Sequence, residues 1–152
     1  MEKYSLLMRI NHWIMAALIL TLLGVGLWMT DLPDTYPGKY DFYGLHKSFG
    51  IVALLFVVFR LSVRMRSSVP KLPKEITKFD TMLSAATIGL LYVCMLGMPL
   101  SGYLMSNFGG YPVMFFSIPV PSVVEKNPEL GKFFREIHGI GGWTLIVMIS
   151  LH

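Results

Sequence analysis

Residues 81–124 read TMLSAATIGLLYVCMLGMPLSGYLMSNFGGYPVMFFSIPVPSVV, without a single Asp, Glu, Lys, Arg or His. A typical soluble domain, in which roughly 25% of residues are charged, does not need so long an uncharged interval. The whole chain has 152 residues, of which 54% are hydrophobic and 14% charged, and its mean hydropathy is +0.59. These values indicate an integral membrane protein, and the length predicts one domain over residues 1–152.

Four apolar runs are candidates for membrane spans. They cover approximately residues 10–29, 45–63, 84–104 and 137–152. A bilayer core of roughly 30 Å requires about 20 helical residues, which the first three runs supply and the fourth does not. The sequence therefore predicts an all-α, integral membrane four-helix bundle whose last helix is truncated at the chain end.

The segments between these runs have the composition of connections. Residues 31–44 are rich in Pro, Gly and Asp, and residues 65–80 carry basic side chains with Pro70 and Pro73. The link over residues 106–136 contains a Gly109-Gly110 pair and several prolines. Because prolines interrupt its uncharged middle, we expect a lid lying at the membrane surface there, and no fifth span.

The distribution of charge predicts the orientation. The N-terminus and the 60–80 region together hold eight Lys and Arg residues and three acidic residues, whereas the other side holds five and six, so the net charges are +5 and −1. Cytoplasmic loops of membrane proteins carry the excess of Lys and Arg. Both termini are therefore expected in the cytoplasm, and the formal charge of +4 reflects topology and not nucleic-acid binding.

The chain has four histidines, and each lies at or near the end of an apolar run: His12, His46, His138 and His152. With the predicted topology, His46 and His138 begin their spans at the external side, and His12 begins its span at the cytoplasmic side. His152 follows His138 by fourteen residues, which is about 21 Å and almost a whole number of turns, so both rings share one helix face. The sequence therefore predicts two pairs at two depths, His12 with His152 and His46 with His138.

Two imidazoles from facing helices can ligate one haem iron axially, and six-coordinate iron of this kind favours electron transfer over oxygen binding. A single histidine at a membrane end is more often an interfacial anchor, but four at two matched depths favour two haem sites. A structural zinc site is disfavoured because neither pair has Cys or carboxylate partners at its depth. Cys94, the one cysteine, is interpreted as a buried apolar residue, and without a C-x-x-C-H motif covalent haem attachment is excluded.

Two cations near the histidines are candidate cofactor-binding residues. Arg60 lies about one turn inside the cytoplasmic end of the second run, where it could pair with a haem propionate; snorkelling to the headgroups explains it equally well. Lys47 follows His46 at the external face, where it could attract a propionate or an anionic substrate, although an interfacial lysine is the simpler interpretation. The sequence leaves both alternatives open.

The chain resembles the prokaryotic cytochrome b561 family of small four-helix, di-haem membrane proteins. The resemblance spans all 152 residues. It rests on the following motifs: Tyr4 with His12-Trp13, Gly26-Leu27-Trp28-Met29, Leu45-His46-Lys47-Ser48-x-Gly50, Arg60-x3-Arg64, Ser101-Gly102-Tyr103-Leu104, His138 and His152. Members of the family continue past the last ligand, so the resemblance implies that the C-terminal end of the family domain is missing here.

The resemblance implies two non-covalent haem b groups, iron protoporphyrin IX, held by the two histidine pairs in a multi-pass protein of the bacterial inner membrane. It implies electron transfer across that membrane and exchange with ubiquinone or ubiquinol of the quinone pool. Narrower expectations are superoxide:ubiquinone oxidoreductase activity, as in superoxide oxidases, or service as the cytochrome b subunit of a partner redox complex. Expected partners are membrane lipids and a periplasmic redox or lipocalin-like isoprenoid-binding protein, with no nucleic acid.

Overall fold

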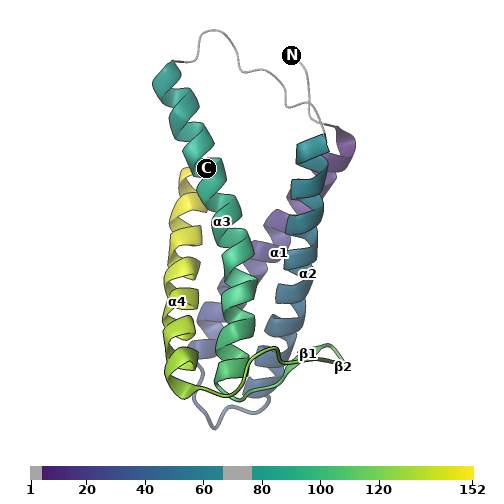
Figure 1. Cartoon of the computed structure of the whole chain (residues 1–152), viewed down its shortest axis with the longest axis vertical. Helices are drawn as coiled ribbons and strands as arrows, with labels where there is room; N and C mark the ends of the chain where they lie inside the picture. Colours follow the sequence, from purple (N-terminus) through teal and green to yellow (C-terminus); the bar gives the residue numbers. More distant parts are fainter. Residues whose placement is uncertain (1–4, 67–76) are drawn as a thin grey trace.

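The computed structural model describes residues 5–66 and 77–152, and in these ranges the chain forms four long helices and one short β-hairpin (Figure 1). The helices are α1 (Leu6–Asp31), α2 (Lys39–Arg66), α3 (Lys78–Phe108) and α4 (Pro128–Leu151). The strands β1 (Val113–Phe115) and β2 (Ile118–Val120) form the hairpin between α3 and α4. The predicted four-helix architecture is present, with this small sheet added.

Three of the helices, α1, α2 and α3, are long and apolar enough to cross a membrane, as judged over the described residues. Helix α4 has 24 residues, but its first three turns carry Glu129, Lys132, Arg135 and Glu136. Its uncharged part therefore begins at Ile137, where the sequence predicted the start of the fourth span. The chain is a multi-pass membrane protein whose fourth helix begins with polar turns.

Helices α2 and α4 begin six and nine residues before the approximate starts, residues 45 and 137, that the apolar runs predicted. Helix α2 begins at Lys39, directly after a turn in which Gly38 has a φ of 77°. The Lys39 ammonium donates hydrogen bonds to the Leu32 carbonyl (2.7 Å) and to the Asp34 carboxylate (2.8 Å), which closes the connection from α1. This hydrogen bond lowers the pKa of Asp34 below its ordinary value.

Capping residues explain the other helix starts. Asn127 precedes Pro128 at the first turn of α4, and its side chain accepts a hydrogen bond from the Leu130 N–H. Ser5 and Thr77 cap α1 and α3 in the same way. A side-chain oxygen at this position satisfies a backbone N–H that has no partner within the helix, and proline is favoured in the first turn. The helices therefore extend beyond the apolar windows because their polar first turns are stabilised locally.

The segment after α3 is an antiparallel hairpin, where we expected an irregular lid. Val113 pairs with Val120 and Phe115 with Ile118, and Phe116 in the turn has a φ of 53°, an unusual value for a residue other than glycine. Because Pro119 has no N–H to donate, such a strand is tolerated only at a sheet edge, as here. Between Phe108 and Pro128 the structure has this hairpin and no helix, in agreement with the expectation that this link is not a fifth span.

The hairpin is fastened to α2. The Ser48 hydroxyl, which is almost fully buried, accepts a hydrogen bond from the Phe116 N–H (2.9 Å) and can donate to the Met114 carbonyl at 3.1 Å. The neighbouring Lys47 ammonium donates to the Pro112 carbonyl (3.3 Å). The hairpin therefore lies over the end of the bundle at which α2 begins (Figure 1).

The four helices are arranged as two packed halves. Helix α1 packs against α2 and α3 packs against α4, while α2 and α3 contact each other across the bundle. The start of α1 and the end of α2 lie at the end of the bundle opposite the hairpin (Figure 1). Of the predicted link over residues 65–80, residues 67–76 lie outside the described residues, as do Lys71, Lys74 and Lys3, which counted toward the predicted orientation.

Candidate functional site

The structure brings the four histidines together in two pairs, the pairs that the sequence predicted. The ring centroids of His46 on α2 and His138 on α4 lie 6.4 Å apart, and those of His12 on α1 and His152 after α4 lie 6.3 Å apart. We call the first the hairpin-side pair, because His46 lies beside the hairpin, and the second the terminal pair. Each pair joins a helix of the α1–α2 half either to the middle of α4, at His138, or to the residue directly after it, His152.

The spacing within each pair fits two axial ligands of one metal ion. A metal–imidazole bond is about 2 Å long, and C–N bonds of about 1.33 Å place each ring nitrogen roughly 1.1 Å from its ring centroid. Two imidazoles on opposite sides of one ion therefore have centroids about 6.2 Å apart. The observed separations of 6.3 and 6.4 Å agree with this value.

His138 is held in place through its Nδ1 atom. Nδ1 lies 3.0 Å from the Met98 carbonyl oxygen and 3.1 Å from the Ser101 hydroxyl, and this hydroxyl donates to the same carbonyl (2.9 Å). In the tautomer that leaves Nε2 free, Nδ1 carries the proton and donates it to the Met98 carbonyl. Metal-ligating histidines are oriented by such a hydrogen bond from the second ring nitrogen. The contact therefore orients His138 as a metal-ligating histidine would be oriented, with Nε2 free in this tautomer.

His46 is oriented differently from His138. Its Nδ1 atom is buried and has no hydrogen-bond partner among the residues that the structure describes. Its position is set by its place on α2, two residues before Ser48, and by close packing against α1. The hairpin-side pair thus combines one imidazole with a hydrogen-bonded second nitrogen and one without.

A glycine of the neighbouring helix lies against each ring of the hairpin-side pair. A Cβ atom added to Gly26 on α1 would lie 3.2 Å from Cε1 of His46, and one added to Gly102 on α3 would lie 3.1 Å from Cε1 of His138. These distances are shorter than ordinary van der Waals contacts of 3.4–4 Å. Glycine at both positions therefore lets the helices approach closely enough for the two rings to reach the centre of the bundle.

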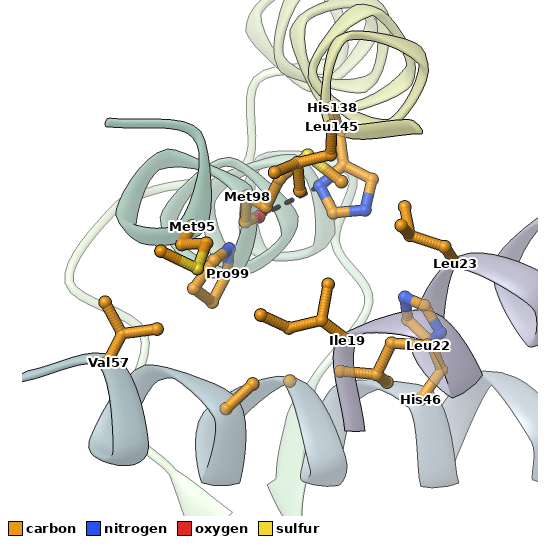
Figure 2. Close-up of a pocket in the computed structure, with 12 residues that line it drawn as sticks. Ile19, Leu22, Leu23, His46, Val57, Met95, Met98, Pro99, His138 and Leu145 are labelled. Atoms are coloured by element: carbon orange, nitrogen blue, oxygen red, sulfur yellow. Dashed lines mark hydrogen bonds between the residues drawn. The ribbon is translucent and has the colours of Figure 1, made fainter. Parts of the chain in front are cut away.

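The rings of His46 and His138 line an apolar cavity between the helices (Figure 2). Figure 2 shows His138 reaching in from α4 and His46 from α2, with the hydrogen bond from His138 to Met98 drawn as a dashed line. Apart from the two histidines, the lining consists of the following residues: Ile19, Leu22, Leu23, Gly50, Ala53, Val57, Met95, Met98, Pro99 and Leu145. The apolar wall suits a hydrophobic cofactor.

The terminal pair lies at the other end of the bundle. The ring of Trp13 packs on that of His12 with 5.4 Å between centroids, and His152 is exposed. Arg60 reaches from α2 to this end, where its Nη1 atom donates to the Met8 carbonyl (2.8 Å), one turn before His12. The structure thus places Arg60 at the level of the terminal pair, where the sequence predicted it.

Lys47 lies next to the hairpin-side pair, but its ammonium already makes one hydrogen bond within the protein. It follows His46 on α2, and the hydrogen bond from its ammonium to the Pro112 carbonyl leads it toward the hairpin. Its predicted contact with a propionate or an anionic substrate stays a prediction.

A metal centre built from protein ligands alone is not evident. In residues 5–66 and 77–152, no group of three or more His, Cys, Asp or Glu side chains gathers in a way that could hold an ion. Two imidazoles are nevertheless sufficient for haem, because the macrocycle supplies the other four ligands. The residues present therefore fit a porphyrin better than a free metal ion.

Sequence reasoning missed the residues that position the histidines. Ser101, Gly102 and Ser48 appeared only as letters of motifs, and Met98 and Asn11 did not appear. The roles of Met98 and Ser101 depend on α3 crossing α4 beside His138, about 40 residues away in sequence, which no local pattern indicates. An amide side chain next to a candidate ligand in an apolar run, as in Asn11-His12, was a signal that could have been noticed.

Comparisons with known proteins give two matches. A family model described as prokaryotic cytochrome b561 matches residues 3–152. The protein named cytochrome b561 homolog 2 of Escherichia coli (strain K12) is 28% identical over 153 residues, which cover 99% of this chain and 81% of that protein.

Proposed function

The chain belongs to the prokaryotic cytochrome b561 family of membrane electron-transfer proteins, and we propose that it carries electrons across the bacterial inner membrane through two haem b groups. His46 and His138 would hold one group and His12 and His152 the other. The observation that carries this proposal is the presence of two imidazole pairs, each with the spacing of axial ligands, at opposite ends of one bundle.

When bound, haem iron with two imidazole ligands supplies one-electron transfer with no open coordination position for a substrate. Along α4, the fourteen residues between His138 and His152 correspond to about 21 Å, so two sites would divide the path across the membrane into shorter steps. This geometry favours a relay between the two membrane surfaces.

The protein's own residues set the environment of each site. At the hairpin-side pair, the Met98 carbonyl orients His138 and favours the tautomer with the proton on Nδ1, and the apolar cavity wall offers water few hydrogen-bond partners. At the terminal pair, Arg60 supplies a positive charge that we expect to pair with a propionate. A low-dielectric wall and a nearby cation both tune the potential at which a site accepts an electron.

Quinone exchange and the electron donor are further parts of the proposal. The family relation supports ubiquinone or ubiquinol as one partner, with both chain ends in the cytoplasm and the hairpin outside. The cation Lys47 beside the hairpin-side pair favours, as a second candidate function, an anionic external donor such as superoxide. Stopped-flow measurement of superoxide decay with and without ubiquinone tests this activity; no acceleration by the holoprotein would remove the second candidate.

Single histidine replacements test the two sites. In the detergent-purified protein, His46→Ala and His138→Ala should each remove the same haem and leave about one haem per chain, while His12→Ala and His152→Ala should remove the other. Trp143→Ala, an exposed ring between the two α4 ligands, is the matched control and should keep both haems. The measurements are the pyridine haemochrome content and the reduced α-band. Loss of both haems from every single variant in folded protein would contradict two independent sites.

A further inference from the structure

Asn11, next to His12, is the most unusual buried residue of the bundle. Its side chain is 4% exposed, and both its amide nitrogen and its amide oxygen lack a hydrogen-bond partner among the described residues. Burying an amide without partners costs stability, so buried polar groups are nearly always satisfied. An amide left in this state next to a candidate ligand indicates that its partner is a bound group.

The side chain of Arg60, on α2, reaches the turn of α1 that precedes Asn11. Its Nη1 atom donates to the Met8 carbonyl, and the carbonyl of residue 8 points along the helix toward residues 11 and 12. A guanidinium has five N–H donors, and the structure assigns a hydrogen bond to one nitrogen. The ion pair found among the described residues joins Lys39 to Asp34, so Arg60 has no carboxylate partner within them. Its charge is therefore available to an anion.

These two side chains select the chemistry of the bound group. Arg60 repels a cation and attracts an anion, and the Asn11 amide can add a neutral donor to the same oxygen atoms. A carboxylate takes several such hydrogen bonds at once, which are stronger than those between neutral groups. Because the Asn11 amide is buried within the protein, a cofactor that inserts into the bundle as the chain folds is a better candidate partner than a lipid headgroup at the surface.

We propose that the Asn11 amide and the Arg60 guanidinium together bind a carboxylate of the cofactor held by His12 and His152. This inference rests on the proposed function, because it requires a haem at the terminal pair. It adds Asn11 as a cofactor-binding residue and assigns its partner as a propionate. The terminal pair and the hairpin-side pair differ in their polar neighbours. Apart from the two histidines, the residues that line the cavity at the hairpin-side pair have no polar side chains that could bind a carboxylate.

The replacement Asn11→Leu tests the proposal through two quantities that should move in opposite directions. The haem of the terminal pair should dissociate roughly tenfold to a hundredfold faster, because a hydrogen bond to a charged group is lost. The apoprotein, made under haem limitation, should melt at the same or a higher temperature, because an unsatisfied buried amide is removed. Haem transfer to a scavenger protein and thermal unfolding measure the two quantities.

The chain provides its own controls for this variant. Retention of the haem at the hairpin-side pair shows that the variant is folded. Asn107→Leu is the matched replacement, since Asn107 is also buried but donates from Nδ2 to the Tyr103 carbonyl (2.9 Å) near the hairpin. It should leave haem dissociation from the terminal pair unchanged.

Two further arms identify the anion. Reconstitution with haem whose propionates are methyl esters should weaken binding at the terminal pair of the wild type, and should have much less additional effect in Asn11→Leu, as expected for two coupled groups. If a lipid phosphate is the partner, the effect of the variant will instead depend on the anionic lipid content of the nanodisc and not on esterification, which overturns the proposal.

Failure of this inference is distinguishable from failure of the proposed function. If the wild type carries both haems and Asn11→Leu releases the terminal one at the wild-type rate, Asn11 is no cofactor-binding residue. If Asn11→Leu lowers the stability of apoprotein and holoprotein equally with no change in haem dissociation, its role is structural and the proposal is wrong. If the wild type carries no haem at the terminal pair, the proposed function itself fails.

Discussion

Individual residues decide how closely the imidazoles approach each other. His46 rests against Gly26 and His138 against Gly102, and in each case the hydrogen atom of glycine occupies the place where any other residue would have a methyl group or more. The same ring edge, Cε1, faces the glycine in both cases. The approach of the rings therefore depends on two glycines, which have no functional group.

Replacement of Gly102 by valine should remove the haem of the hairpin-side pair and leave the other. Even the first added carbon would lie 3.1 Å from Cε1 and 3.4 Å from Nδ1 of His138, so the larger side chain must displace the ring from its contact with the Met98 carbonyl. Haem content per chain, together with a redox titration that separates the two sites, measures the outcome.

Gly97→Val is the matched control, because a Cβ at Gly97 on the same helix meets nothing within 4 Å. It should keep both haems. Equal loss of haem from the two variants would indicate that valine in α3 acts through the helix and not through His138.

At the scale of elements, the β-hairpin is tied to α2 by one buried hydroxyl. Ser48 accepts from the Phe116 N–H and lies beside the Met114 carbonyl, so one side chain serves two backbone groups of the hairpin. Phe116 in addition packs edge-on against Phe49 (5.5 Å between centroids). Because Ser48 is one turn or less from His46, the position of the hairpin and that of the ligand are linked through α2.

Ser48→Ala should loosen the hairpin. An unsatisfied backbone N–H costs about 1–3 kcal/mol, and local opening of the hairpin is the cheapest way to rehydrate the Phe116 amide. We expect faster amide hydrogen exchange over residues 113–124 and little change in the helices. Ser62→Ala, which removes an exposed hydroxyl bonded to the Val58 carbonyl of α2, is the control. Unchanged exchange in the hairpin would show that Ser48 does not fasten it.

The elements were only partly predictable from the sequence. The four helices followed from apolar runs, but their starts did not, because the first turns of α2 and α4 are polar and are stabilised by contacts outside the run, such as that of Lys39 with Asp34. The Asn127-Pro128 dipeptide was a readable cap signal. The hairpin was not predicted, for two reasons. Its turn places Phe116 in a backbone conformation that favours glycine, and the prolines in residues 112–121 argued against strands.

At the scale of the whole molecule, the histidine pairs were predictable because helical rise and alternating direction fix the depth of each ring. Fourteen residues on α4 set one separation, and the alternation of helices sets which rings share a level. The contacts of His138 with Met98 and Ser101 were not predictable, since they depend on how α3 and α4 pack side by side. The histidines of each pair could therefore be predicted from the sequence, whereas the residues that orient them could be identified only from the structure.

The orientation of the bundle stays a prediction and can be measured. Ser122→Cys, exposed near the hairpin, should react with a membrane-impermeant maleimide applied to intact spheroplasts, whereas Met65→Cys, exposed near the end of α2, should react only after lysis. The physical reason is the excess of Lys and Arg at the α2 end. Cys94, within α3, gives the background. Labelling of position 65 before lysis, with position 122 protected, would reverse the topology.

The arrangement in two packed halves has a consequence for biogenesis. Each histidine pair takes one imidazole from α1 or α2 and the other from α4 or from His152 directly after it. A nascent chain that still lacks α4 therefore has only one imidazole of each pair. Under the proposed function, both haems would bind only after α4 has been synthesised, and each would then bridge an early and a late segment of the described chain.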